Sequence, residues 1–481
     1  MSELQTIDAR NRETEEQVRF PVAEELGSRF AQAGHQLYLV GGTVRDALLG
    51  RLGNDFDFAT DARPERVREL LTGWADAIWD TGIAFGTMGA SKRGATVEIT
   101  TFRTDAYDRM SRNPEVRFGS SIEEDLVRRD FTVNAMAIDL ATRKLVDPHD
   151  GRAALRKRIL DTPATPQESF NDDPLRMMRA VRFVSQLGFD VAPRVLDAIG
   201  DMAGQLERIT AERVQVELSK LLCGRFPRRG LELMVDTGLA EIVLPEVPAM
   251  RLEIDEHHQH KDVYQHSLVV LDQAVDLEEP DTEPDLVLRL AALLHDIGKP
   301  ATRRFVEGGG VSFHHHEVVG AKMVRKRLRA LRYSKDVIEE VAQLVYLHLR
   351  FHGYGKGEWT DSAVRRYVTD AGPLLPRLHK LVRADCTTRN RRKAAALQRT
   401  YDDLETRISR IAAEEDLARV RPDLDGNEIM RLLGLPPGPL VGRAWRYLKE
   451  LRLDRGPLEH DDAIAELRKW AENEGITPTG D

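Results

Sequence analysis

The chain of 481 residues is too long for one compact domain, and its length predicts three or more. Hydrophobic residues make up 41% of the chain and charged residues 31%, which is typical of a soluble protein. The sequence shows neither an apolar run of about 18 residues nor a secretory leader, so we expect a cytoplasmic protein that makes no membrane contact. The net charge of −9 argues against a uniformly basic nucleic-acid binder. The two cysteines, Cys223 and Cys386, have no CxxC spacing, which argues against a disulfide framework or a cysteine-based zinc site.

The first 150 residues alternate between short apolar runs and helical patterns. Strands are expected at residues 37–40, 55–60 and 96–102. Residues 43–50 predict a helix that ends at Gly50, and residues 131–139 predict a strand or a buried segment. The polar stretch 103–121 contains Asn-Pro and predicts a mobile loop.

From about residue 150 onward, helical periodicity replaces the strand patterns. Residues 173–188 predict a helix with a stop signal at Gly188. Three basic clusters, at residues 225–229, 322–332 and 389–393, are interpreted as solvated helix faces. The pattern predicts an α+β fold class, with a small head of mixed sheet and helices followed by a long helical body.

Gly41 and Gly42 lie between the first strand and the helix that follows it. Glycine at such a turn lets backbone N–H groups approach a phosphate next to a helix N-terminus, which favours anions. Arg45, one turn into the helix, adds a positive charge. Taken alone, this pattern also fits an ordinary strand–turn–helix connection.

Asp55 and Asp57 alternate with Phe56 and Phe58 on the second strand. Because residues i and i+2 of a strand point to the same face, the two carboxylates project together while the phenylalanines face the core. Adjacent carboxylates repel unless a cation joins them, and Mg²⁺ prefers such oxygen ligands and also binds triphosphates. The spacing predicts a metal-dependent nucleotide site, in which two ions activate a hydroxyl and stabilise a leaving pyrophosphate.

Ten of the fourteen histidines lie between His257 and His352. Six residues of this half of the chain follow the order of ligands in the HD phosphohydrolase superfamily, which they resemble: His266, His295, Asp296, His316, His348 and Asp385. That resemblance implies a helical domain around one or two metals, and imidazole with carboxylate suits Ni, Mn, Fe, Co or Zn. A bound metal would generate hydroxide for phosphoester hydrolysis; the alternative is a degenerate HD fold kept as a scaffold. Six other histidines are interpreted as surface or supporting residues: His257, His258, His260, His314, His315 and His352.

Five segments together resemble the superfamily of class II CCA-adding enzymes and bacterial poly(A) polymerases. They are LVGGTVRDALLGRLGNDFDFAT (39–60), TGIAFGT (81–87), VEITTFR (97–103), EEDLVRRDFTVNAMAID (123–139) and NDDPLRMMRAVRF (171–183). They follow the order of the family and cover most of residues 35–190. The resemblance implies a polymerase-β-like nucleotidyltransferase head that uses Mg²⁺, with tRNA, CTP and ATP as partners.

The resemblance also implies roles for individual residues. The implied catalytic carboxylates are Asp55 and Asp57, which hold Mg²⁺, and Glu98 as a third. The implied nucleotide-binding residues are Gly42, Arg45, Arg129, Asp130, Asp173, Arg176, Arg179 and Arg182.

Asp173, Arg176, Arg179 and Arg182 recur every third residue and form one drifting stripe on a helix. Such a stripe is also typical of an ordinary arginine-rich surface helix. The family gives Asp173 and Arg176 the task of reading the base. A carboxylate that accepts from the exocyclic amino group, with an arginine that donates to the ring nitrogen, would accept cytosine and adenine and reject uracil and guanine.

We therefore expect addition of C, C and A to the 3′ end of tRNA. The alternatives are a poly(A) polymerase, an enzyme that adds only CC or only A, and an HD phosphohydrolase with a regulatory head; TGIAFGTMGA (81–90) resembles the CCA-adding branch more closely. Residues 424–445 resemble the part of such enzymes that supports tRNA. The predicted domains are a polar arm (1–24), the head (25–150), a helical neck and body (151–256), an HD domain (257–410) and a helical tail (411–481).

Overall fold

The computed structural model describes residues 21–51, 53–80, 82–83, 86–104, 117–119, 121–251, 262–306, 310–351, 354, 359–388, 390–415 and 421–476. The chain divides into two compact units, Met1–Pro245 and Glu246–Asp481. Within the described ranges, no helix is long and apolar enough to cross a membrane.

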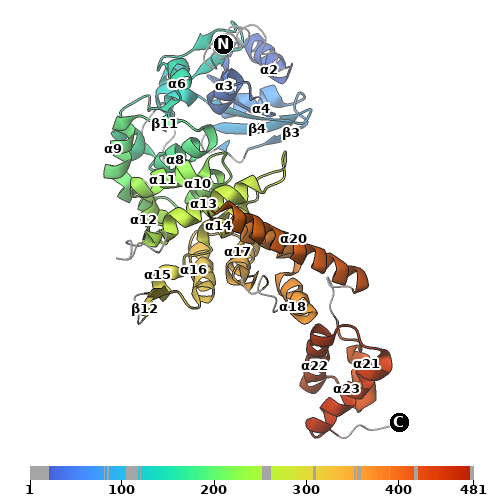
Figure 1. Ribbon diagram of the computed structural model, residues 1–481. Coiled ribbons are helices and arrows are strands. Elements are labelled where there is room, and N and C mark those ends of the chain that lie inside the picture. Colours follow the sequence, from blue (N-terminus) through green and yellow to red (C-terminus); the bar gives the residue numbers. More distant parts are fainter. Residues whose placement is uncertain are drawn as a thin grey trace. The chain divides into compact units, whose positions relative to one another are not determined.

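A mixed seven-stranded sheet forms the centre of the first unit (Figure 1). The strand order is β3-β4-β5-β2-β1-β8-β9, in which β2 and β5 run parallel and the other neighbours run antiparallel. The strands are β1 (Leu37–Val40), β2 (Asp55–Thr60), β3 (Ala77–Trp79), β4 (Thr87–Lys92), β5 (Ala95–Thr101), β8 (Ala137–Asp139) and β9 (Leu145–Val146). A separate short pair joins β6 (Arg103–Thr104) to β7 (Arg117–Phe118).

Helices pack on this sheet through regularly spaced apolar side chains. In the first of them, Val22, Leu26 and Phe30 recur every four residues, so they share one face, and all three are buried. Every residue of β1 is buried, as expected for a strand inside a sheet covered by helices. These helices are α2 (Pro21–Gln32), α3 (Gly41–Leu48), α4 (Pro64–Leu71), α5 (Ile122–Val127) and the 3₁₀ turn η2 (Thr132–Asn134).

After the sheet, the first unit continues mainly as helices. Thr165 begins one of them with a capping box to Glu168, and Gly188 ends the next in a left-handed conformation with φ of 70°. The elements are α6 (Gly151–Lys157), β10 (Ile159–Leu160), α7 (Pro166–Asp172), α8 (Leu175–Leu187), β11 (Asp190–Val191), α9 (Pro193–Met202), η3 (Ala203–Arg208), α10 (Ala211–Leu222), α11 (Pro227–Asp236) and α12 (Leu239–Val243). Strands β10 and β11 pair in parallel.

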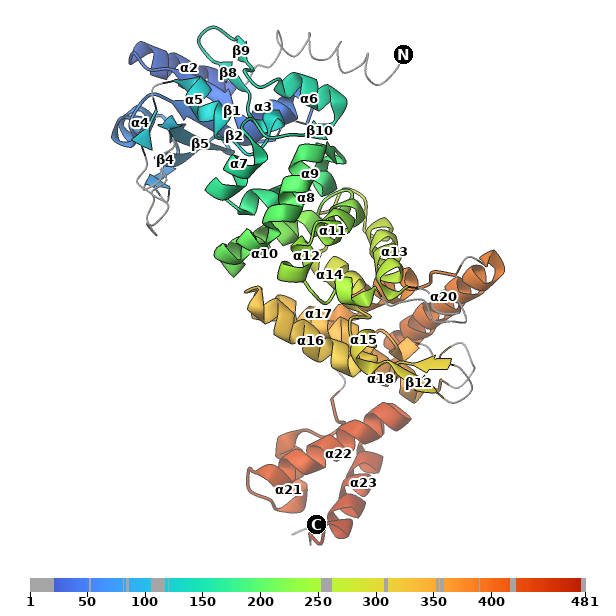
Figure 2. The same cartoon turned by 90° about the vertical axis from the view of Figure 1, so that its left-hand side faces the viewer.

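Helices form most of the described part of the second unit, with one hairpin between α15 and α16 (Figure 2). Helix α14 is buried along nearly its whole length, from Val287 to Leu294, which marks it as the central helix. The elements are η4 (Pro248–Met250), α13 (Val263–Asp276), α14 (Leu286–Leu294), α15 (Lys299–Thr302), β12 (Arg304–Val306), β13 (Gly310–Ser312), α16 (His316–Ala330), α17 (Lys335–Leu347), α18 (Asp361–Ala371), η6 (Gly372–Leu374), α19 (Leu375–Ala384) and α20 (Arg391–Glu414).

Three further helices of the second unit enclose a core of their own. They are α21 (Gly426–Leu433), α22 (Pro439–Arg455) and α23 (His460–Asn473). Leu433, Leu448 and Leu467, one from each helix, are buried together in it.

The structure confirms the α+β fold class and most of the predicted head. The strands at 37–40 and 55–60 are confirmed residue for residue, and the third is found at Ala95–Thr101. The helix expected at 43–50 begins two residues earlier, at Gly41. Strands β3 and β4 were not expected, and strands continue beyond residue 150 in two short pairs, β10–β11 and β12–β13, which are too short to show an alternating pattern. Of the predicted mobile loop, residues 105–116 and 120 lie outside the described residues.

Candidate nucleotidyl-transfer and metal sites

Three carboxylates meet on neighbouring strands of the sheet. In β2, Asp55 and Asp57 are exposed while Phe56 and Phe58 are buried, as the alternation predicted. The parallel strand β5 pairs Asp57 with Glu98. Although solvent reaches its side chain, Asp57 is partly desolvated by the surrounding protein, and this desolvation and the neighbouring Asp55 raise its pKa against the opposing charge of Arg129. Partial desolvation and the two aspartates also raise the pKa of Glu98.

This carboxylate cluster fits a divalent cation. The side chains are hard oxygen donors, and the repulsion among them, which adds to desolvation in raising the pKa of Asp57 and Glu98, is relieved by a bound Mg²⁺. The geometry therefore groups Glu98 with Asp55 and Asp57, as predicted.

The Gly-Gly turn lies directly beside these carboxylates. Gly41 has φ of 68°, and a Cβ at this position would lie 2.6 Å from Arg129 Nη1 and 3.8 Å from Asp57 Oδ2. The backbone conformation therefore favours glycine, and any side chain at this position would also displace the guanidinium of Arg129. Thr43 ties the helix to the strand, because its hydroxyl accepts a hydrogen bond from the backbone N–H of Asp57 at 3.1 Å. Thr43 was not among the predicted site residues.

Helix α8 brings the predicted base-reading stripe to the same place. A cavity of about 840 Å³ is lined by eight arginine and lysine side chains and five aspartates. Its lining contains all predicted nucleotide-binding residues and two of the three carboxylates: Gly42, Arg45, Asp55, Asp57, Arg129, Asp130, Asp173, Arg176, Arg179 and Arg182. The excess of cations beside a carboxylate cluster is what a metal-bound triphosphate requires.

Different partners hold the side chains of Asp173 and of Arg176. The carboxylate of Asp173 accepts from Arg213 at 2.8 Å and from the backbone N–H of Leu175 at 3.1 Å. Arg176 donates to Ser169 Oγ at 2.8 Å and to the carbonyl of Arg128 at 2.6 Å. Both side chains line the cavity in these held positions.

Two further pairs fix Arg179 and Arg182 of α8. Asp130 is buried and accepts from Arg179 at 2.7 Å and from Asn134 at 2.9 Å. Although burial opposes ionisation, Arg179 and these hydrogen bonds lower the pKa of Asp130 to about 2. Arg182 forms a buried ion pair with Glu217 of α10 at 3.1 Å. Its guanidinium therefore both lines the cavity and neutralises Glu217.

Arg45 shows the same arrangement nearer the Gly-Gly turn. It donates to Asn134 Oδ1 at 2.7 Å and to the carboxylate of Asp46. Arg129 is held by Asp125 at 3.1 Å. These partners orient the cations without removing them from the cavity lining.

Helix α10 supplies residues that sequence analysis did not find. Arg213 and Lys220 line the cavity, and Glu217 pairs with Arg182. The three are spaced at i, i+4 and i+7, so they share one polar face. The sequence contains that spacing, but no local sequence pattern predicts that this face of α10 packs against α8.

A second cluster lies between the helices of the second unit. His266 and His295 place their Nε2 atoms 3.2 Å apart, and these atoms lie 3.6 Å and 3.2 Å from Asp296 Oδ2. Asp385 Oδ1 lies 3.0 Å from His266 Nε2. On the other side, the Nε2 atoms of His316 and His348 lie 3.2 Å and 3.9 Å from Asp296 Oδ1. Asp296 therefore stands between two ligand groups, and the structure brings all six predicted ligands together.

The histidines of this cluster are oriented for a cation. The Nδ1 atoms of His295, His316 and His348 lie within 2.9 Å of backbone carbonyls three residues earlier, to which they donate. Each Nδ1 therefore carries a proton, and Nε2 is the nitrogen that faces the centre of the cluster, as in metal-binding histidines. In the described part of the chain, Nε2 of His316 and of His348 is buried without a hydrogen-bond partner. Imidazole nitrogens that gather around a buried carboxylate fit a divalent metal ion.

The predicted supporting histidines divide into two groups. His314 and His315 are exposed, as expected. The other four, His257, His258, His260 and His352, lie outside the described residues.

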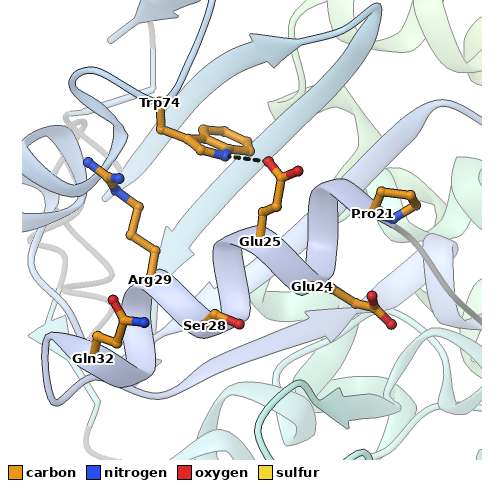
Figure 3. Close-up of a pocket in the computed structure, with 7 residues that line it drawn as sticks. All are labelled: Pro21, Glu24, Glu25, Ser28, Arg29, Gln32 and Trp74. Atoms are coloured by element: carbon orange, nitrogen blue, oxygen red, sulfur yellow. Dashed lines mark hydrogen bonds between the residues drawn. The ribbon is translucent and has the colours of Figure 1, made fainter.

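A shallower cavity of about 530 Å³ lies along α2 (Figure 3). Its charged groups are already engaged: Glu25 accepts from Trp74 Nε1 at 3.1 Å and from Arg93 at 2.9 Å, and Arg29 donates to the carbonyl of Thr72. These bonds fasten α2 to the sheet, and we assign the cavity no chemical role.

Known families match the chain in three consecutive segments. They are the poly A polymerase head domain at residues 37–161, the probable RNA and SrmB-binding site of polymerase A at 188–250, and the HD domain at 263–390. Over 442 residues, the chain is 31% identical to a CCA-adding enzyme of Anoxybacillus flavithermus, and the match covers 91% of this chain and 93% of that enzyme. The chain belongs to the CCA-adding enzyme family of tRNA nucleotidyltransferases.

Other members of the CCA-adding enzyme family are similar over comparable lengths. An A-adding tRNA nucleotidyltransferase of Deinococcus radiodurans is 34% identical over 442 residues, covering 90% of this chain and 95% of that enzyme. The crystal structure of a Bacillus stearothermophilus CCA-adding enzyme in complex with CTP matches with a TM-score of 0.67 at 28% identity, covering 94% of this chain and 98% of that one. The family resemblance and the enzyme class expected from the sequence are confirmed.

Proposed function

We propose that the first unit adds C, C and A to the 3′ end of tRNA from CTP and ATP. The observation that carries this proposal is the single cavity in which the carboxylates Asp55 and Asp57 face the base-reading candidates Asp173 and Arg176. Relatives of similar identity bear the names CCA-adding and A-adding enzyme. The number and order of the added nucleotides are therefore part of the proposal.

In the proposed reaction, the 3′-hydroxyl oxygen of tRNA bonds to the α-phosphorus of the nucleotide while the bond to pyrophosphate breaks, and the hydroxyl proton passes to solvent water. Asp55 and Asp57, with Glu98 beside them, would hold Mg²⁺, which supplies positive charge to the attacking and leaving oxygens. Gly42, Arg45 and Arg129 bind the phosphates. Their role is electrostatic, because the charge to be stabilised lies on phosphate oxygens.

The base is read by Asp173 and Arg176 without a nucleic-acid template. Arg213 orients the carboxylate of Asp173, and Ser169 orients the guanidinium of Arg176. Cytosine and adenine offer an amino donor beside a ring-nitrogen acceptor, which matches this carboxylate and guanidinium, whereas uracil and guanine would offer neither group a partner on the base. Arg179, held by Asp130, and Arg182 complete the positive lining. The predicted contact of Asp130 to the nucleotide stays a prediction.

One experiment tests this assignment against the alternatives. The protein is incubated with Mg²⁺, each NTP, and tRNA transcripts that lack CCA, lack only A, or are complete. Ordered addition of C, C and A that then stops supports the proposal. Addition of A alone to the transcript that ends in CC would place the chain with the A-adding enzymes, and long A tails would make it a poly(A) polymerase.

We further propose that the histidine cluster of the second unit binds divalent metal and hydrolyses phosphoesters. In that reaction a water oxygen bonds to phosphorus, the ester P–O bond breaks, and the leaving oxygen gains a proton. His266, His295, Asp296 and Asp385 would hold one ion, and Asp296, His316 and His348 would hold a second, so that bound water is activated for attack on phosphorus. Ni, Mn, Fe, Co and Zn all suit these ligands.

Metal content and hydrolysis of p-nitrophenyl phosphate test this second proposal. We expect two bound ions per chain after loading with Mn²⁺ or Ni²⁺, and one or fewer in His348→Asn. A wild-type chain that binds no transition metal would make the cluster a scaffold.

A further inference from the structure

The two aspartates of β2 lie beyond the point where its pairing with β1 ends. Strand β5 pairs with all six residues of β2, Asp55–Thr60. On the other side of β2, the pairing with β1 ends at Leu39 and Phe58, and the chain then enters α3 at Gly41. The register of these described strands therefore gives Asp55 and Asp57 a partner in β5 but none in β1.

The side chain of Thr43 takes the place of that strand partner. Thr43 is the third residue of α3, which packs on β1 and β2 (Figure 2). Its hydroxyl oxygen accepts from the backbone N–H of Asp57 at 3.1 Å, and the hydroxyl donates to the backbone carbonyl of Asp55 at 3.5 Å. Because a hydroxyl has one proton and two lone pairs, it forms both bonds at once. One side chain thus replaces two main-chain bonds of the interrupted ladder.

These two bonds hold the backbone from which the metal-binding carboxylates project. The bonded carbonyl belongs to Asp55 and the bonded N–H to Asp57, so the hydroxyl spans the segment that carries both side chains. Mg²⁺ requires nearly ideal octahedral geometry, with oxygen ligands at about 2.0–2.1 Å. A shift of this backbone by a fraction of an ångström would therefore weaken the metal site.

Thr43 also belongs to the turn that forms the phosphate side of the cavity. It directly follows Gly41 and Gly42, which line the cavity together with Asp55 and Asp57. Thr43 itself is not one of the described lining residues. A metal-bound triphosphate has to contact the helix start and the carboxylates at the same time, and the hydroxyl of Thr43 joins these two parts.

We propose that Thr43 is a positioning residue for nucleotide addition, which sets the place of the Mg²⁺-binding carboxylates relative to the phosphate-binding turn. It acts through the backbone of Asp55 and Asp57 and contacts neither the metal nor the nucleotide. This inference rests on the proposed nucleotide addition in the first unit. It adds that the affinity for Mg²⁺ depends on a residue outside the cavity lining.

The Mg²⁺ dependence of CTP binding tests this role. Equilibrium dialysis of the full-length protein with radiolabelled CTP measures the affinity at a series of Mg²⁺ concentrations. Thr43→Val keeps the shape of the side chain and removes both hydrogen bonds. It should raise the Mg²⁺ concentration for half-maximal CTP binding roughly tenfold. CTP binding without Mg²⁺, which depends on the arginines of the cavity, should stay unchanged, and the Mg²⁺ dependence of nucleotide addition should shift with that of binding.

Other variants separate positioning from a loss of stability. Thr43→Ser retains the hydroxyl and should restore the wild-type Mg²⁺ requirement, whereas Thr43→Cys, with a weaker donor and acceptor, should give an intermediate shift. Thr72→Val, which removes a hydroxyl bonded to the carbonyl of Arg68, should leave the requirement unchanged. Gly50→Ala, which strains the backbone at the end of α3, should also leave it unchanged. The same Mg²⁺ requirement in Thr43→Val, Thr43→Cys and the wild type would overturn the proposal.

The two readouts distinguish this inference from the proposed function. CTP binding that depends on Mg²⁺ and on Thr43, without any nucleotide addition, would refute the proposed function and support the positioning role. Ordered addition with an unchanged Mg²⁺ requirement in Thr43→Val would support the function and refute the role of Thr43. Wild-type CTP binding that is independent of Mg²⁺ would refute both.

Discussion

The side chain of Asp130 is buried and ionised, so its charge must be compensated inside the protein. Arg179, Asn134 and the backbone N–H of Phe131 provide this compensation and lower its pKa from the ordinary 3.8 to about 2. A carboxylate whose pKa is lower in the folded than in the unfolded state stabilises the fold above the unfolded pKa, and this stability is lost as the pH falls through the folded pKa.

We therefore expect acid to remove the contribution of Asp130 between pH 4 and pH 2. Asp130→Asn should be less stable than wild type at pH 6, and this difference should shrink by about 2 kcal/mol by pH 2. Urea unfolding over this pH range measures it. Asp190→Asn, at an exposed ion pair, is the control and should show little change. A difference independent of pH would mean that Asp130 is protonated in the folded protein.

Arg176 offers a residue-scale test of base reading. Its contacts with Ser169 and the carbonyl of Arg128 hold the guanidinium at the cavity. Arg176→Ala should reduce the preference for CTP over UTP by about 10- to 100-fold and change triphosphate binding less. Steady-state kinetics on tRNA transcripts measure both effects, with Arg194→Ala, which removes an exposed pair to Asp161, as control. Unchanged preference would assign base reading to other residues.

At the residue scale, the direction of a side chain could be predicted from the sequence wherever a local pattern determines it. The alternation of Asp55 to Phe58 predicted which side chains face the core, and the i+3 spacing from Asp173 to Arg182 predicted one stripe. Partners distant in sequence were not predictable in this way. Arg213 lies 40 residues from Asp173, and only the packing of α10 on α8 brings them together.

At the element scale, the turn from β1 into α3 carries the strictest requirement in the head. Gly41→Ala would strain a backbone with φ of 68°, and its Cβ would displace the guanidinium of Arg129. We expect a loss of about 1–2 kcal/mol in the free energy of unfolding, together with a loss of nucleotide addition of tenfold or more.

Gly50→Ala separates the two effects of that substitution. Gly50 has φ of 69°, but a Cβ there would have no neighbour within 4 Å. The stability loss should therefore be similar, about 1 kcal/mol, while nucleotide addition stays at the wild-type level. Equal losses of activity in both variants would show that destabilisation alone, and not the position of Arg129, explains the effect.

Among the elements, those with long periodic patterns were predictable and the short strands were not. Helix α8 was expected through Gly188, where it ends. The hairpin β12–β13 has three residues in each strand, which is too few for alternation to be distinguished from a loop. This hairpin could therefore not be predicted from the sequence.

At the scale of the whole molecule, the chain contains two compact units, and each encloses a site of different chemistry. The first uses carboxylates and arginines, which suit Mg²⁺ and triphosphate. The second uses four histidines and two aspartates, which suit transition metals. The described residues named for each site all belong to its own unit.

This separation predicts that the two activities can be removed independently. Asp55→Ala should abolish nucleotide addition, because one of three clustered carboxylates is lost, and leave hydrolysis of p-nitrophenyl phosphate at the wild-type level. His348→Asn should do the reverse, with its metal content reduced and its Tm checked because His348 is buried. Both activities are measured on the same preparations, with Mg²⁺ for addition and Mn²⁺ or Ni²⁺ for hydrolysis. If either substitution removes both activities while the protein stays folded, one site depends on the other and the proposed division of labour between the units is wrong.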